Sequence, residues 1–227
     1  MNLTKVTRVF IVFGLSVSLY AQTCDVSNYQ PTDYDYTMRA HETQRLTATE
    51  SFVLAISWSK GFCKYQKQKI SSVLNNPTSS QEDKEYSLKK KADLKVQCYS
   101  NNDFGWVVHG LWGQNYDDGH PKFCDTNAGQ IDFSVIKENL CMSPSAGLIQ
   151  REWEKHGTCD FNTAKQYYSQ TKSLYEKFNY PSEIGDKVKA KKWLVANNIS
   201  LTEKNVKVSK NDIFICFDDK LKLTTCE

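Results

Sequence analysis

The chain has 227 residues, of which 40% are hydrophobic and 12% are aromatic. This composition excludes a disordered tail or linker and predicts one folded unit with a sizeable core. The 29 basic and 26 acidic residues nearly cancel, so bulk positive charge does not explain what the protein binds.

The N-terminus has the pattern of an export signal. Two basic residues precede an apolar run over 9–20 that is too short to span a bilayer, and Ala21 is a small residue at a plausible cleavage point. We expect residues 1–21 to be a signal peptide and residues 22–227 to be a single secreted or periplasmic domain, with no membrane partner after cleavage. An uncleaved N-terminal anchor is the alternative.

Two short segments rich in β-branched and aromatic residues predict buried strands, 51–58 and 104–109. Near the C-terminus, alternating residues over 213–217 predict a further strand. A turn at 218–220 then predicts a returning strand over 221–223.

Helices are expected over four segments, 82–96, 145–156, 164–178 and 186–196. In the third, one stripe at helical spacing is expected to pack in the core, and it consists of Tyr167, Thr171, Leu174, Tyr175 and Phe178. We interpret the lysines of 89–91 and 187–192 as solvated helix faces rather than phosphate sites. Hairpin signals with interspersed helices predict an α+β fold, a mainly antiparallel central sheet with flanking helices.

Eight cysteines is an even and high count for this length. In an exported protein they predict disulfides. Because eight cysteines allow 105 pairings, the count alone does not give the connectivity.

Chemistry-bearing residues gather around two of the four histidines. One segment reads VVHGLW and holds His109; the other reads REWEKHGTC and holds His156. On a helix, Glu152, Lys155 and His156 share a face, with Arg151 beside them. A carboxylate, two cations and an imidazole make a poor core but suit an anion that undergoes proton transfer.

Purely structural interpretations exist for both histidines. His156 can close a helix before Gly157, which would take a left-handed cap. His109 can end a buried strand under Trp112.

A zinc site is a third interpretation, since His109, Glu152, His156 and Cys159 supply ligand types. However, the zinc-binding His-Glu-x-x-His spacing does not occur here, and the two cations would oppose a divalent ion. We therefore expect no metal and no cofactor.

The segments HGLW (109–112) and EWEKHGTC (152–159) resemble the two active-site segments of the ribonuclease T2 family. In addition, 52–63 resembles the first core strand of the family's bacterial branch, and 213–218 resembles its late strand. The stretches 65–95 and 180–205 show no such resemblance.

The resemblance implies a metal-independent endoribonuclease that cleaves single-stranded RNA by transesterification through a 2′,3′-cyclic phosphate. It implies His156 as the base, His109 as the acid, Lys155 and Glu152 as stabilisers of the transition state, and Arg151 as a phosphate ligand. DNA lacks the 2′-hydroxyl and is not expected to be cut. A monomer is the default expectation.

Contacts to the bases are expected from Trp112, and more weakly from Tyr116 and Leu148. The family usually has His where Arg151 stands, and Pro-Asp or Pro-Gln at 113–114, where this chain has Gly-Gln. Two alternatives stay open: an exported RNA-binding or toxin-like protein of the same fold with weak or no turnover, and an acid phosphatase-like hydrolase.

Relatives of this family pair the cysteine after the first segment with the one that ends the second, which implies Cys124 with Cys159. Cys216 and Cys226 flank the expected C-terminal hairpin, and a Cys63–Cys98 bridge would close the variable segment between two strands. Cys24 with Cys141 follows by elimination only. Asn198-Ile-Ser200 matches the acceptor pattern for glycosylation.

Overall fold

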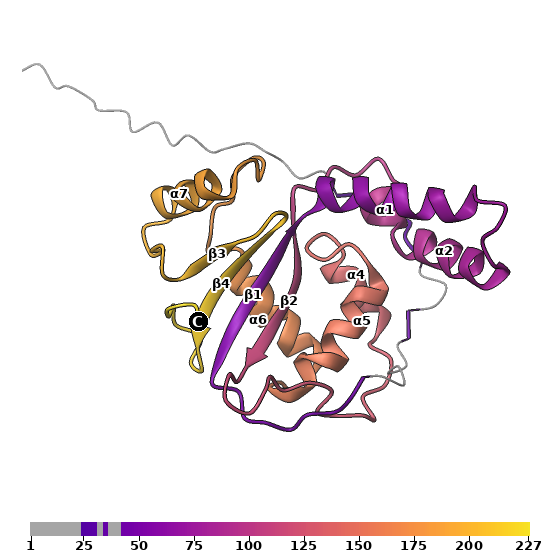
Figure 1. Cartoon of the computed structure of the whole chain (residues 1–227). Helices are drawn as coiled ribbons and strands as arrows, with labels where there is room; N and C mark the ends of the chain where they lie inside the picture. Colours follow the sequence, from indigo (N-terminus) through magenta and orange to yellow (C-terminus); the bar gives the residue numbers. More distant parts are fainter. Residues whose placement is uncertain (1–23, 31–33, 36–41) are drawn as a thin grey trace, which may run out of the picture.

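The computed structural model describes residues 24–30, 34–35 and 42–227. The expected signal peptide, 1–21, lies outside them. The elements follow in the order β1 (Ser51–Trp58), α1 (Ser59–Leu74), α2 (Gln81–Asp93), α3 (Lys95–Cys98), β2 (Trp106–Gln114), α4 (Phe133–Asn139), α5 (Ala146–Lys155), η1 (Gly157–Cys159), α6 (Ala164–Tyr175), α7 (Lys187–Asn197), β3 (Val206–Val208) and β4 (Asp212–Asp218) (Figure 1).

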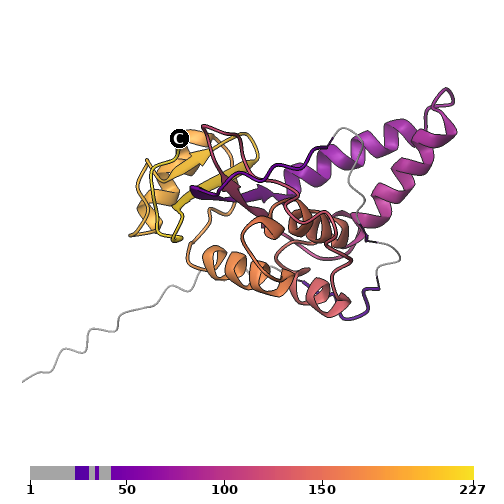
Figure 2. The same ribbon diagram turned by 90° about the horizontal axis from the view of Figure 1, so that it is seen from below.

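The four strands form one antiparallel sheet in the order β2-β1-β4-β3. Helix α6 lies behind this sheet in Figure 1 and beneath it in Figure 2, whereas α1 and α2 form a pair that extends away from it. The α+β fold with a mainly antiparallel sheet and flanking helices is therefore confirmed.

One face of the sheet forms the main core, because alternate strand residues are apolar and point the same way. On β4, Ile213 and Ile215 are fully buried, whereas Phe214 between them is only partly buried. The core-facing residues of the strands are Phe52, Leu54, Ile56, Val108, Leu111, Val206, Ile213, Ile215 and Phe217. We call the opposite side, which carries Trp112 and Phe214, the second face of the sheet.

The stripe expected on 164–178 packs in the core as predicted. Tyr167, Thr171 and Leu174 have no exposed surface, and Phe178 is 8% exposed. Helix α6 begins where the Thr163 hydroxyl accepts a hydrogen bond from the Gln166 N–H, which satisfies one free donor at the helix N-terminus.

Three strand predictions need correction. The strand predicted over 104–109 is β2, which runs from Trp106 to Gln114 and so includes the whole HGLW segment. The resemblance of 52–63 to one strand ends at Trp58, because Ser59 begins α1. The returning strand over 221–223 is reduced to one bridge between Phe217 and Leu223, since the chain turns with a φ of 58° at Leu221.

The helix predictions hold with smaller changes. The segment 82–96 is divided at Leu94 into α2 and α3, and the other three predicted helices correspond to α5, α6 and α7. Among the described residues, α1, α4, η1 and β3 are elements that the sequence did not predict. No helix of the described part of the chain is both long and apolar enough to cross a membrane.

Four disulfides join Cys24–Cys141, Cys63–Cys98, Cys124–Cys159 and Cys216–Cys226, the same pairs as those expected. Asn198 is buried, and its side chain accepts a hydrogen bond from the Asn179 N–H and donates to two carbonyls. A glycan on Asn198 would break these contacts, so the acceptor pattern there does not describe an accessible site in the folded protein.

Candidate active site

Strand β2 contains a β-bulge at His109. Ile56 of β1 pairs with Val108 and Ala55 pairs with Gly110, so His109 has no partner of its own in the register. Such an extra residue changes the alternation of the strand. Val108 and Leu111 face the core, while Gly110 and Trp112 lie on the second face beside His109.

The absence of a side chain at Gly110 allows α5 to approach this strand. A Cβ at this position would collide with Oε2 of Glu152 and lie 2.7 Å from Nε1 of Trp112. The glycine of the first sequence segment therefore makes room for the carboxylate of the second segment. The two segments meet at this point, although 42 residues separate Gly110 from Glu152 in sequence number.

Glu152 is the centre of the cluster, and it is 1% exposed. Its Oε1 lies 3.3 Å from Nε2 of His109, and its Oε2 accepts a hydrogen bond of 2.7 Å from Nε1 of Trp112. The same Oε2 lies 3.9 Å from Nε2 of His156. One buried carboxylate thus contacts both histidines and the tryptophan of the two segments.

The two histidines have opposite pKa shifts. Burial opposes the charged form of His109, but the charge of Glu152 and its hydrogen bond outweigh burial and raise the pKa of His109 above its usual value. Burial lowers the pKa of His156 to about 4, because the charge of Glu152 does not compensate for lost solvation and for the nearby cations.

Glu152 itself stays ionised. Burial alone would raise its pKa, but the charge and hydrogen bond of His109, the charge of His156 and the hydrogen bond of Trp112 together lower it to about 2. At neutral pH the ionised Glu152 therefore lies between two different imidazoles. His109 has a raised pKa, and His156 has a lowered pKa and is neutral.

His156 is the C-cap of α5, so its position at a helix end agrees with the structural interpretation. Gly157, however, does not take the expected left-handed cap, because the chain continues directly into η1. A Cβ at Gly157 would instead collide with the ring of Trp153. Nδ1 of His156 is buried and has no hydrogen-bond partner among the described residues, which leaves one ring nitrogen uncommitted to the protein.

Two cations flank the cluster on α5. Burial lowers the pKa of Lys155, while the charge of Glu152 opposes that shift. Nη2 of Arg151 forms an ion pair of 2.8 Å with Oε1 of Glu42. Sequence reasoning missed Glu42, because a single acid 109 positions away carries no local signal of this contact.

Trp112 is held by a hydrogen bond and by three aromatic neighbours. The ring lies with its centroid 5.4 Å from His109, 5.5 Å from His156 and 6.2 Å from Phe214. Together with its hydrogen bond to Glu152, these contacts make Trp112 a brace for both histidines. The Trp112 side chain is partly exposed to solvent.

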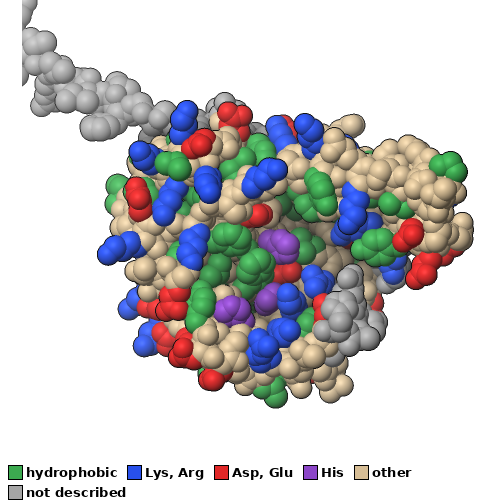
Figure 3. Space-filling view, viewed as in Figure 1, with side chains coloured by type: hydrophobic (Ala, Val, Ile, Leu, Met, Phe, Trp, Pro, Cys, Tyr) green, Lys and Arg blue, Asp and Glu red, His purple; other side chains and the backbone are tan. Residues whose placement is uncertain are grey.

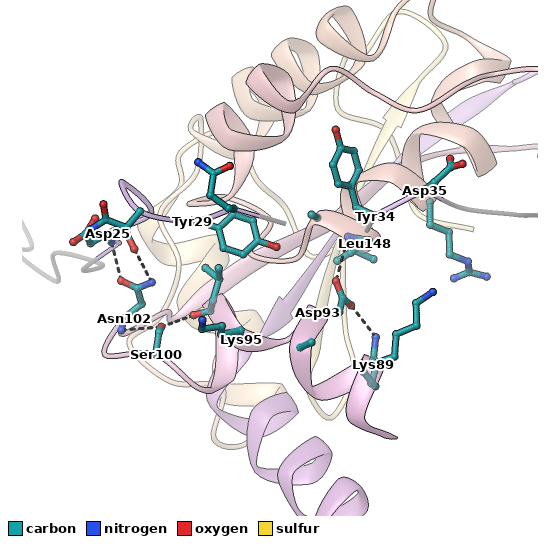
Figure 4. A pocket seen from close by; sticks show the side chains of 18 of the residues that line it. Asp25, Tyr29, Tyr34, Asp35, Lys89, Asp93, Lys95, Ser100, Asn102 and Leu148 are labelled. Carbon is teal, nitrogen blue, oxygen red and sulfur yellow. Dashed lines mark hydrogen bonds and ion pairs between the residues drawn. The ribbon is translucent and has the colours of Figure 1, made fainter. Parts of the chain in front are cut away.

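Tyr116 and Leu148 do not join this cluster through any contact described here. The Tyr116 ring packs edge-on against His120, at 5.1 Å, after the end of β2. Leu148 lines a hollow of about 1430 Å³ between the N-terminal segment, α2 and α5, which Arg151 also lines. Figure 4 shows Leu148 in the wall of this hollow, with Tyr34 and Asp93 nearby.

The disulfide Cys124–Cys159 ties the chain after β2 to η1, directly after His156. Beside it, the N–H of Phe123 donates to the carbonyl of Lys155 at 2.9 Å. Because Cys159 is in a disulfide, it cannot supply a thiolate to a metal. No group of three or more His, Cys, Asp or Glu within the described ranges is arranged to hold a metal ion.

On the surface, histidine side chains are accessible on the face shown in Figure 3, with Lys and Arg on one side and hydrophobic side chains on the other. An anion that reached the histidines from solvent would meet positive charge and an apolar surface together. That combination suits a polyanion with flat apolar groups.

Comparison with known proteins gives a consistent result. The model of the ribonuclease T2 family matches residues 49–225. A "Probable ribonuclease" of Haemophilus influenzae is 34% identical over 201 residues, 86% of this chain and 68% of that protein. A "Ribonuclease" of Aeromonas hydrophila is 33% identical over 100 residues, 44% of each chain. The crystal structure of RNase NT in complex with 5′-AMP aligns over 79% of this chain and 91% of that chain, with 15% identity and a TM-score of 0.47.

Proposed function

The chain belongs to the ribonuclease T2 family, and from this premise we propose that it is a metal-independent endoribonuclease that cleaves single-stranded RNA through a 2′,3′-cyclic phosphate. The observation that carries the proposal is the buried carboxylate of Glu152 between two imidazoles, 3.3 Å from Nε2 of His109 and 3.9 Å from Nε2 of His156. His156, with a pKa of about 4, is neutral and suited to accept a proton, whereas His109, with a raised pKa, is suited to donate one.

In the proposed reaction His156 takes the proton of the ribose 2′-hydroxyl, and the 2′-oxygen forms a bond to phosphorus. The bond from phosphorus to the 5′-oxygen breaks, and His109 donates a proton to that oxygen. Because Nε2 of His109 faces Glu152, Nδ1 is the nitrogen left for the leaving oxygen. Slower hydrolysis of the cyclic phosphate follows, with the roles of the two histidines exchanged.

Negative charge accumulates on the phosphate oxygens during this reaction, and two cations support its stabilisation. Lys155 stands one residue before the proposed base, and Arg151 lies one turn earlier on the same helix. Glu152 serves the reaction by keeping the proton on His109. We propose a base contact for Trp112, which lies in the cluster, and more distant base contacts for Tyr116 and Leu148, which lie outside it.

We further propose that the chain is exported after removal of residues 1–21 and acts as a secreted or periplasmic monomer without a membrane partner. Four disulfides in a chain of this size support an oxidising compartment.

The test is digestion of single-stranded RNA by the purified mature protein in excess chelator, with mass analysis of the products. We expect 2′,3′-cyclic phosphate ends, uncut DNA, and cleavage slowed on the order of a hundredfold or more in the matched variant His156→Ala. Loss of cleavage in chelator, restored by zinc or magnesium, would contradict the mechanism. RNA that is bound but not cut would favour the binding-protein alternative.

A further inference from the structure

The second face of the sheet continues away from the histidines along one row of residues. Gly110 of β2 pairs with Ala55 of β1, Ala55 pairs with Phe214 of β4, and Phe214 pairs with Lys207 of β3. Because paired residues of adjacent strands point to the same side, this row leads from the floor below Glu152 to the outer edge of the sheet.

The side chains of this row change character along it. Gly110 and Ala55 are small and buried, and Glu152 and Trp112 lie over Gly110. Phe214 follows as a partly exposed aromatic ring, and Lys207 ends the row as an exposed cation on a three-residue strand. An aromatic ring with a cation behind it is the pattern of a surface that stacks a base and pairs with the next phosphate.

Phe214 is also continuous with the active site. Its ring centroid lies 6.2 Å from that of Trp112, which contacts both His109 and His156. Strands are spaced about 4.8 Å apart, so Phe214 lies roughly 10 Å from Gly110 across two strands. A nucleotide that flanks the scissile phosphate lies at this range.

Packing of the main core does not require an aromatic residue at this position. The core side of β4 is complete with Ile213, Ile215 and Phe217, which are 0–2% exposed. Phe214 belongs to the other side of the strand, where the nearest residues of β4 on the same face are Asp212 and Cys216. Asp212 is itself held by the hydroxyls of Ser57 and Ser209, which keeps its charge one row away from Lys207.

We propose that Phe214 and Lys207 form an RNA subsite outside the catalytic cluster, in which the Phe214 ring stacks on a base that flanks the scissile phosphate and Lys207 pairs with the next phosphate. This proposal rests on the proposed function, because its occupant is the RNA strand held at the histidines. The occupant is single-stranded, since a paired base does not offer its face to a ring.

The test uses a single-stranded 2′-O-methyl RNA octamer, which lacks the nucleophile and is not cleaved. Its dissociation constant is measured by fluorescence anisotropy for the wild type, Phe214→Leu, Phe214→Trp and Lys207→Glu. Lys220→Glu, in the exposed turn after β4, is the control with the same charge change. Thermal unfolding of each variant verifies that the fold persists.

We expect Phe214→Leu to weaken binding about tenfold. We expect Phe214→Trp to bind like the wild type, because stacking needs a ring. Lys207→Glu is expected to weaken binding about fivefold and Lys220→Glu to leave it unchanged. Equal binding by the wild type and Phe214→Leu, equal weakening by Leu and Trp, or equal effects of the two lysine changes would each overturn the proposal. So would a wild-type dimer that Phe214→Leu dissociates, because the face would then bind a second copy.

The outcomes separate the two proposals. A wild-type protein that binds the octamer through Phe214 but leaves unmodified RNA intact would refute the proposed function and keep the subsite. A protein that cuts RNA with no change on substitution of Phe214 would refute the subsite alone.

Discussion

The hydroxyl of Tyr167 bonds both backbone groups of Leu111, accepting from its N–H at 2.9 Å and donating to its carbonyl at 3.1 Å. Leu111 lies on β2, an edge strand, two residues after the bulge at His109. A fully buried side chain of α6 therefore replaces a missing neighbouring strand at this point. Tyr167 therefore fixes, from the core side, the strand segment next to the bulge at His109.

The first prediction concerns the two histidines. We expect His109→Ala and His156→Ala each to lower turnover on the order of a hundredfold to ten-thousandfold, since each removes general acid or base catalysis. Steady-state cleavage of RNA measures the effect, and thermal unfolding of each variant verifies that the fold persists. Half of the wild-type activity in either variant would show that the roles are wrong.

The second prediction concerns the pH profile. The acid limb of kcat/KM reports the loss of neutral His156, and we expect it near pH 4. Glu152→Gln removes a charge that raises the pKa of both histidines, so both limbs are expected to move to lower pH. A profile measured from pH 3 to pH 9 tests this. Limbs that stay in place or move upward would exclude Glu152 as the group that sets both values.

The third prediction separates Arg151 from Lys155. Arg151→Ala is expected to raise KM about tenfold, because a charged hydrogen bond to phosphate is lost, and Arg151→His is expected to be tolerated. Lys155→Ala is expected to lower kcat more than it changes KM. Steady-state kinetics on one RNA substrate distinguishes them, and the same pattern of change in both Ala variants would show that the two cations share one role.

The fourth prediction tests the approach of α5 to β2. We expect Gly110→Ala to lower turnover on the order of a hundredfold, because a Cβ would displace the Glu152 carboxylate and with it both histidines. Gly129→Ala is the matched control, since a Cβ there meets no atom within 4 Å. Activity assays with both variants are sufficient, and wild-type activity in Gly110→Ala would mean that Glu152 does not need its position.

The fifth prediction concerns the bridge next to His156. Replacing Cys124 and Cys159 by Ser is expected to lower the free energy of unfolding by about 2–4 kcal/mol and to lower activity as well. Replacing Cys216 and Cys226 by Ser is expected to lower stability with a smaller effect on activity, because this bridge lies at the C-terminal end. Denaturant unfolding and RNA cleavage are measured on both; a larger activity loss in the second pair would contradict the positioning role of the first.

Patterns that depend on neighbouring residues were predictable from the sequence. Strand β1 matches the predicted bounds, and the stripe on α6 is buried, because alternation and helical spacing are local signals. Helix α1 was missed because its apolar face is sparse: Cys63, Ile70 and Leu74 pack in a small cluster, and most of the 16 residues are polar.

The site was predictable only in part for a related reason. Shared helical spacing placed Glu152 and His156 together, but the bulge at His109 depends on register with another strand, and a helix–strand contact brings Gly110 under Glu152. The pairing of Arg151 with Glu42 is likewise a long-range contact. Tyr116 and Leu148 rested on resemblance alone, and the structure places them outside the contacts of the cluster.

Gly110, beneath Glu152, also limits how this site can be built into another protein. Neither segment contains a complete acid–base pair: the strand supplies an imidazole and an empty position, and the helix supplies the carboxylate that fills it. Grafting one segment into another protein would therefore carry only half of the proposed acid–base pair. A designed or evolved scaffold must acquire the bulge, the glycine and the helix end together.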